Sequence, residues 1–148
     1  GNLATQAKFA YDTTGSYVSA PANLIPTTDL YLLAILNSPL CEWFISLKAA
    51  TRAGGFFEFK PMYVAELPVF PATEWQKAPI IETIQKILTD STGRRYEWME
   101  EVNERLFDYY QLTTAERNLL KEIEKTYSYA ARTYGIWKDL PEFCNEGE

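Results

Sequence analysis

The sequence predicts an α+β fold: a small mixed β-sheet with two buried helices, followed by a C-terminal helical hairpin or three-helix bundle. Short β-type runs alternate with turn residues in the first half of the chain. Residues 30–47 form an apolar run long enough for two helices, and apolar residues recur at helical spacing from Pro79 onward. A chain of 148 residues fits one domain, or one small domain with a helical appendix.

The N-terminal residues are expected to form a β-hairpin. Residues 9–12 have the composition of a strand, Thr13, Thr14 and Gly15 that of a turn, and residues 16–20 that of a returning strand. The chain begins within a strand-like pattern and lacks an initiator Met, so we expect a fragment of a larger protein.

The apolar run LYLLAILNSPLCEWF is interrupted by Asn37, Ser38 and Pro39. A membrane-spanning helix needs about 20 uninterrupted apolar residues, so the run predicts two buried helices with a corner between them. Thr27 or Thr28 is expected to cap the first helix near Asp29, and Ser38 the second. Proline suits the first position of a helix, where its missing amide would have no partner.

The second helix is expected to carry one apolar face and to end near residues 51–55. That face comprises Leu40, Trp43, Phe44 and Leu47. Residues 56–60 then read as a strand, which Pro61 ends, and residues 62–70 as a short helical turn or strand.

Three amphipathic helices are predicted in the second half. Their apolar stripes begin at Ile80, at Tyr96 and after Thr113, where Thr113 and Glu116 match a capping box. These patterns divide the chain into residues 1–76, a helical subdomain at residues 77–134 and an acidic tail at residues 135–148.

Charge separates the two halves. Residues 1–78 hold five basic and six acidic side chains, whereas residues 79–148 hold nine basic and fourteen acidic ones. An anionic partner should therefore meet the first half. The chain has no His, which excludes Ser-His and Cys-His catalytic pairs. Cys41 and Cys144 have no metal or redox spacing, and without a signal peptide we expect free thiols in the cytoplasm.

Four segments occur in a characteristic order: KFAYDTTGSYV, DLYLLAILNSPLCEWFI, RAGGFFEFKPMYVAELPVF and EWMEEVNERLFDYYQLTTAE. This order resembles the C-terminal specificity region of TaqI-like adenine-specific DNA methyltransferases and of type II and fused type IIG restriction-modification enzymes. In that family an "LLaiLNS" helix precedes a glycine-containing loop, an aromatic strand and a "P-x-Y-x-x-x-L-P" segment. The corresponding residues here are Leu32 to Ser38, Gly54 and Gly55, Phe56 to Lys60, and Pro61, Tyr63, Leu67 and Pro68.

The later part of the chain resembles the family's "E-x-I-D-x-L-V-Y-x-L-Y-x-L-T-x-x-E" ending, from Glu101 to Glu116, and the resemblance spans residues 8–124. Asn103 stands where the family usually has Asp.

The resemblance implies a DNA target-recognition domain that serves a neighbouring N6-adenine methyltransferase. The sequence has no Asn/Asp-Pro-Pro-Tyr/Phe motif for a flipped adenine and no glycine-rich loop for S-adenosylmethionine. The fragment should therefore bind double-stranded DNA without catalysing a reaction or holding a cofactor or metal. The parent enzyme would use S-adenosylmethionine and Mg²⁺, and its methyltransferase and nuclease domains would be the fragment's partners. No membrane partner is expected.

Candidate DNA contacts are residues with groove-reading or phosphate-binding groups on predicted loops. They fall into three groups: Lys8, Thr13, Thr14, Ser16 and Tyr17 on the hairpin; Lys48, Arg52, Gly54 and Gly55 after the second helix; and Lys60 with Tyr63. Asn37 and Ser38 are assigned to structure, as the corner between helices.

Two alternative functions remain open from sequence. Glu58 and Lys60 have the E-x-K spacing of metal-dependent nucleases and would share one face of a strand. The acidic helical part could instead be a protein-interaction module that docks on the recognition half or on the missing domains.

Overall fold

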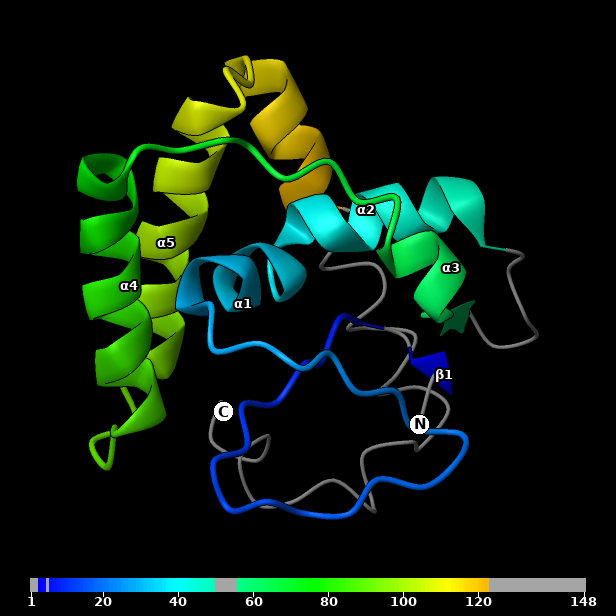
Figure 1. Ribbon diagram of the computed structural model, residues 1–148. Helices are drawn as coiled ribbons and strands as arrows, with labels where there is room; N and C mark the ends of the chain where they lie inside the picture. Colours follow the sequence, from blue (N-terminus) through cyan, green and yellow to red (C-terminus); the bar gives the residue numbers. More distant parts are fainter. Residues whose placement is uncertain (1–2, 5, 50–55, 123–148) are drawn as a thin grey trace.

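The computed structural model describes residues 3–4, 6–49 and 56–122. The elements that it contains are β1 (Leu3–Ala4), α1 (Leu30–Leu36), α2 (Pro39–Lys48), β2 (Phe57–Glu58), α3 (Pro61–Val64), α4 (Glu74–Leu88) and α5 (Arg95–Tyr109). Residues 114–122 are also helical. The chain therefore mixes a small sheet with helices, as predicted, and is mostly helical (Figure 1).

The sheet joins the start of the chain to the segment after α2. β1 pairs antiparallel with β2, with Leu3 opposite Glu58 and Ala4 opposite Phe57. The sheet is thus a two-stranded antiparallel one in the part of the chain that the structure describes, rather than mixed. The strand predicted for residues 56–60 is confirmed but shorter, at Phe57–Glu58.

The predicted hairpin at residues 9–20 is wrong. Residues 6–29 contain no strand and form one long N-terminal loop, the name used below for this segment. Side chains bind several of its amides: Asp12 accepts from Thr14 and Ser16, and Asn37 from Phe9. Such bonds compete with a strand ladder for the same backbone groups.

Helix α1 is capped by Asp29 rather than by the predicted Thr27 or Thr28. Asp29 Oδ1 accepts hydrogen bonds from Tyr31 N at 2.9 Å and Leu32 N at 3.1 Å. A carboxylate at this end also interacts favourably with the helix dipole, so Asp29 outcompetes Thr27 and Thr28. The predicted burial is confirmed, because Tyr31, Ala34, Ile35 and Leu36 are all buried.

The corner between α1 and α2 is confirmed, and the two helices meet at 59°. Pro39 is the first residue of α2 and Ser38 is its N-cap, as predicted, but the Ser38 side chain does not cap. Its buried hydroxyl instead donates to Ile35 O at 2.7 Å, which satisfies a carbonyl at the end of α1.

The predicted apolar face of α2 is only partly correct. Leu40 is buried, but Trp43 is 39% and Leu47 is 65% exposed, and the core side of the helix carries Cys41 and Ile45. α2 ends at Lys48, with Ala49 as its C-cap. The predicted end near residues 51–55 lies outside the described residues.

The helices of the second half follow their predicted stripes with one shifted boundary. α4 begins at Glu74, before Pro79, because Thr73 and Gln76 form a capping box. Pro79 lies inside α4, where it has no amide to donate to the carbonyl four residues earlier. The capping box predicted at Thr113 and Glu116 is confirmed by reciprocal bonds of 2.7 and 3.3 Å.

The helical part packs directly on the first half. α4 contacts both α1 and α5, and Ile80, Ile84, Val102 and Leu106 join Ile35 in one hydrophobic core. Residues 76 and 77 lie inside α4, and the predicted division of the chain there stays a prediction. The predicted tail, residues 135–148, and the end of the third helix lie outside the described residues.

Tyrosine hydroxyls fasten the connector between α3 and α4. Tyr110 Oη donates to Pro68 O at 2.6 Å and accepts from Phe70 N at 3.0 Å, while Tyr31 Oη donates to Phe70 O at 3.1 Å. Farther along, Glu104 accepts from Lys121 at 2.7 Å and from Arg117 at 3.0 Å, which ties α5 to residues 114–122.

No single helix among the described residues is long and apolar enough to cross a membrane. α1 and α2 meet the length and composition requirements only when taken together across their bend.

Candidate nucleic-acid interface

The N-terminal loop is the most exposed segment that the structure describes. Every residue from 12 to 29 is exposed, and the loop lies on the side of α1 and α2 opposite the connector between α3 and α4 (Figure 1). The helical part does not cover it. Long irregular loops on a rigid frame commonly carry binding residues.

A small hydrogen-bonded turn organises the tip of this loop. Asp12 Oδ1 accepts from the amide and the hydroxyl of Thr14, both at 2.7 Å, and Asp12 Oδ2 accepts from Ser16 N at 3.1 Å. Gly15 between them has φ of 79°, a conformation that glycine adopts without strain. The bonds from Thr14, and then those from Ser16, hold the pKa of the Asp12 carboxyl well below its usual range.

Three contacts attach the base of the loop to the helices and to Phe59, the residue after β2. Ala7 N donates to Glu42 Oε1 at 3.0 Å, and the Asn37 side chain bonds both backbone groups of Phe9. On the returning limb, Asn23 Nδ2 donates to Phe59 O at 3.1 Å. These contacts place both limbs of the loop on one frame.

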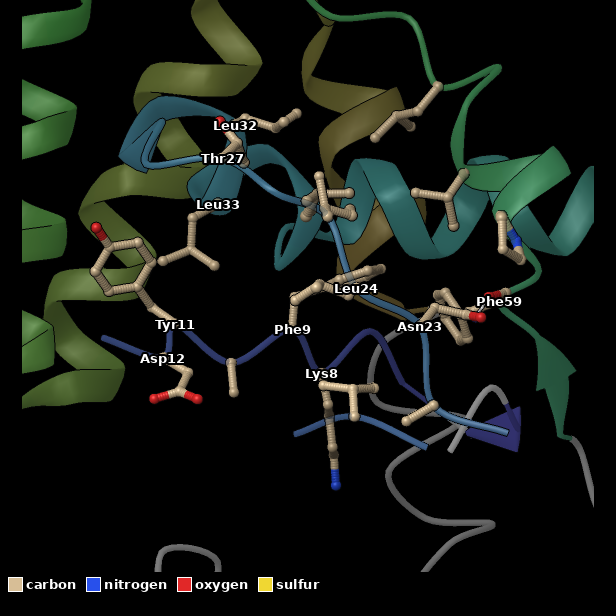
Figure 2. Close-up of a pocket in the computed structure, with 18 of the residues that line it drawn as sticks. Lys8, Phe9, Tyr11, Asp12, Asn23, Leu24, Thr27, Leu32, Leu33 and Phe59 are labelled. Atoms are coloured by element: carbon tan, nitrogen blue, oxygen red, sulfur yellow. Dashed lines mark hydrogen bonds between the residues drawn. The ribbon is translucent and has the colours of Figure 1, made fainter. Parts of the chain in front are cut away.

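A cavity of about 990 Å³ separates the loop from the helices. Its walls are mostly apolar and come from the loop, from α1 and from residues 56–69, with Phe9, Leu24, Leu33 and Phe59 among them (Figure 2). The loop therefore does not pack tightly on α1. Its position depends on the contacts at its base rather than on a continuous apolar interface.

The structure brings the first group of predicted contact residues together on the loop. Lys8 is exposed and its side chain points away from the helices (Figure 2). Thr13 is exposed, Thr14 and Ser16 belong to the Asp12 turn, and Tyr17 is fully exposed. The phenol of Tyr17, the hydroxyl of Thr13 and the ammonium of Lys8 can donate to base edges and phosphates, whereas the Thr14 hydroxyl already donates to Asp12 Oδ1.

The other groups are less available. Lys48 forms a 2.8 Å ion pair with Glu66, and Lys60 forms one of 2.8 Å with Glu58. Tyr63 is half-buried and packs against the core. Arg52, Gly54 and Gly55 lie outside the described residues, so these predicted contacts stay predictions.

Two residues important to the loop did not stand out in the sequence as site residues. Asp12 organises the tip, and the D-x-T-x-S pattern, typical of side-chain turns, is the signal that would have indicated it. Asn23 braces the returning limb, and no local pattern indicates that role because its partner is 36 positions away.

The nuclease alternative finds little support around Glu58. The carboxylate of Glu58, at the end of β2, forms an ion pair with Lys60, which follows the strand. Within residues 3–4, 6–49 and 56–122, no group of three or more Asp, Glu, His or Cys side chains is arranged to hold a metal ion. A two-metal or single-metal nuclease needs more than one such ligand.

Comparison with protein-family models finds a match in the N-terminal part of the chain. Residues 1–69 match the model of the TaqI-like C-terminal specificity domain, and they include the N-terminal loop, α1, α2, β2 and α3. Searches of curated proteins and of solved structures each found no match. The match stops before the segment at residues 101–124, whose resemblance to the family stays a prediction. The N-terminal part of the chain, residues 1–69, is thus similar to the TaqI-like C-terminal specificity domain.

Proposed function

We propose that this chain is the DNA sequence-recognition part of a type II or IIG restriction-modification enzyme. It directs an N6-adenine methyltransferase, or an endonuclease joined to it, carried elsewhere in the parent chain. The family match over residues 1–69 supports a sequence-specificity role, which by itself requires no catalytic group in this chain. Base flipping and chemistry, with S-adenosylmethionine and Mg²⁺, fall to the parent's other domains in the cytoplasm.

The observation that carries the proposal is the N-terminal loop within the matched residues. The loop is exposed from residue 12 to residue 29, is attached to a buried helix pair, and carries a turn made rigid by Asp12. Direct readout needs donors and acceptors held at fixed positions relative to a groove. An exposed loop with an internally bonded tip meets that requirement.

The charges imply weak electrostatic binding. Lys48 and Lys60 are engaged by Glu66 and Glu58, so a phosphate must compete with a carboxylate for each of them. The salt dependence of DNA binding by this chain should therefore be shallow, with a log–log slope on the order of −1 to −3. Most of the affinity in the parent enzyme would come from its other domains.

The acidic helical part serves in this proposal as a support and a docking surface. It packs on α1 and fastens the connector after α3 through Tyr110 and Tyr31. Its outer surface would face the methyltransferase or nuclease domain rather than DNA, because an acidic surface repels phosphates.

Selection from a pool of randomised duplex DNA tests the proposal. The full chain is incubated with the pool at low ionic strength, about 30 mM, where screening is weak. Bound duplexes are then amplified and sequenced over several rounds. The proposal predicts enrichment of one short sequence, and a pool that stays random contradicts it.

A second experiment separates the proposal from the nuclease alternative. Supercoiled plasmid is incubated with the chain and Mg²⁺, and with the Glu58→Ala variant as the control. The recognition proposal predicts intact plasmid in both reactions. Cleavage by the wild-type chain that Glu58→Ala abolishes would instead support the nuclease.

A further inference from the structure

The side chain of Asn37 makes three hydrogen bonds at the base of the N-terminal loop. Asn37 Oδ1 accepts from Phe9 N at 2.9 Å, and Asn37 Nδ2 donates to Phe9 O at 3.0 Å and to Leu33 O at 3.1 Å. The amide thus pairs with both backbone groups of Phe9 as a neighbouring strand would. Among side chains of this length, only that of Asn has one acceptor and two donors in one plane.

The position of Asn37 makes this contact rigid. Asn37 is the C-cap of α1, and α2 begins two residues later at Pro39. The buried Ser38 and Ile35 hold the backbone on both sides, and the bond to Leu33 O keeps the amide pointing in one direction. The amide is therefore attached to a buried part of the fold.

Phe9 and the returning limb of the loop contact the same residue, Phe59. Its ring meets the Phe59 ring edge-to-face, with centroids 6.1 Å apart. The carbonyl of Phe59 in turn accepts from Asn23 on the returning limb at 3.1 Å. Phe9 and Asn23 bracket the tip, which carries Tyr17.

Because a cavity lies under the loop, the contacts at its base determine where the loop stands. About 990 Å³ of space lies between the loop and its supporting helices, so apolar packing alone does not fix where the tip stands. We propose that Asn37 is a positioning residue: it places the tip of the N-terminal loop and thereby sets the DNA sequence selectivity of this chain. This inference rests on the proposed function.

The test compares two chemically identical changes in the full chain. Asn37→Asp keeps the size but removes both donors to Phe9 O and Leu33 O. Asn103→Asp makes the same change at a buried Asn in α5. Asn103 is distant from the N-terminal loop in sequence and takes no part in the hydrogen bonds described above that hold the base of the loop. Asn23→Ala, at an exposed residue, removes only the contact on the other limb and serves if Asn37→Asp does not fold.

Selectivity is the ratio of the dissociation constants for a scrambled duplex and for the duplex enriched by the wild-type chain. We expect Asn37→Asp to lower this ratio about tenfold. That factor corresponds to the free-energy cost of roughly one backbone carbonyl left without its hydrogen-bond donor. Asn23→Ala should lower it by a smaller factor and Asn103→Asp should leave it unchanged. Binding of the scrambled duplex should stay constant, because phosphate contacts tolerate a shifted tip.

A backbone measurement separates failure of this inference from failure of the proposed function. Amide chemical shifts of Thr14 and Ser16, recorded without DNA, should change in Asn37→Asp and stay the same in Asn103→Asp. Unchanged shifts, or an unchanged selectivity ratio in a folded Asn37→Asp variant, overturn the inference. A wild-type chain that enriches no sequence refutes the proposed function, and the shifts alone then decide whether Asn37 positions the loop.

Discussion

The two hydrogen bonds of the Tyr110 hydroxyl give the sharpest quantitative prediction from the fold. Tyr110→Phe keeps the ring, which lies 6.0 Å from the Phe70 ring, and removes only the hydroxyl. The 2.6 Å bond to Pro68 O is exposed, so water can replace it at little cost. The 3.0 Å bond from Phe70 N is partly buried, and that amide loses its partner. We expect a loss of about 1–2 kcal/mol in the free energy of unfolding.

Urea denaturation followed by circular dichroism measures this loss. With an m-value of about 2 kcal/mol/M, the midpoint should fall by about 0.5–1 M urea, with the m-value unchanged. Tyr96→Phe is the matched control, because Tyr96 is 66% exposed and its change should stay within about 0.5 kcal/mol. Equal midpoints for the two variants would refute the claim that Tyr110 fastens the connector to the helical part.

Three further outcomes follow from burial and charge. On α2, Ile45→Ala should cost about 2–5 kcal/mol in the free energy of unfolding and Leu47→Ala less than about 0.5, since Ile45 is fully buried and Leu47 is 65% exposed; urea midpoints compare them. Thr14→Val should raise the pKa of Asp12 toward its ordinary value, as read from carboxyl carbon shifts during acid titration, because the Thr14 hydroxyl is the largest cause of the lowered pKa. Hydrogen bonds from Lys121 and then Arg117 lower the pKa of the Glu104 carboxyl in the folded state. The contribution of Glu104 to stability is therefore present above the pKa of the unfolded state and is lost as pH falls through the pKa of the folded state. Glu104→Gln should flatten the decline of the urea midpoint below about pH 4.5.

The sequence was most informative where the pattern is local and dense. The corner at Ser38 and Pro39, the burial of α1 and the capping box at Thr113 all depend on neighbours within a few residues. The family resemblance at residues 1–69 was likewise carried by short motifs in a fixed order, and the family match confirms it.

The sequence was misleading where a distant partner decides the outcome. The expected hairpin failed because Asn37, far along the chain, binds both backbone groups of Phe9 in place of a returning strand. The face of α2 was misassigned because Trp43 looks like a core residue by type, whereas its exposure depends on which neighbours the fold supplies. The count of basic side chains likewise could not show that Lys48 pairs with Glu66.

Photocrosslinking from the loop tip tests most directly whether the N-terminal loop faces DNA. A benzophenone amino acid is placed at Tyr17, which is fully exposed on the loop, and in a matched variant at Tyr96, which is 66% exposed on α5. Both variants are irradiated with the duplex selected by the wild-type chain. Crosslinks to bases from position 17 and none from position 96 are the predicted result, whereas equal crosslinking or crosslinks from position 96 alone would contradict the account.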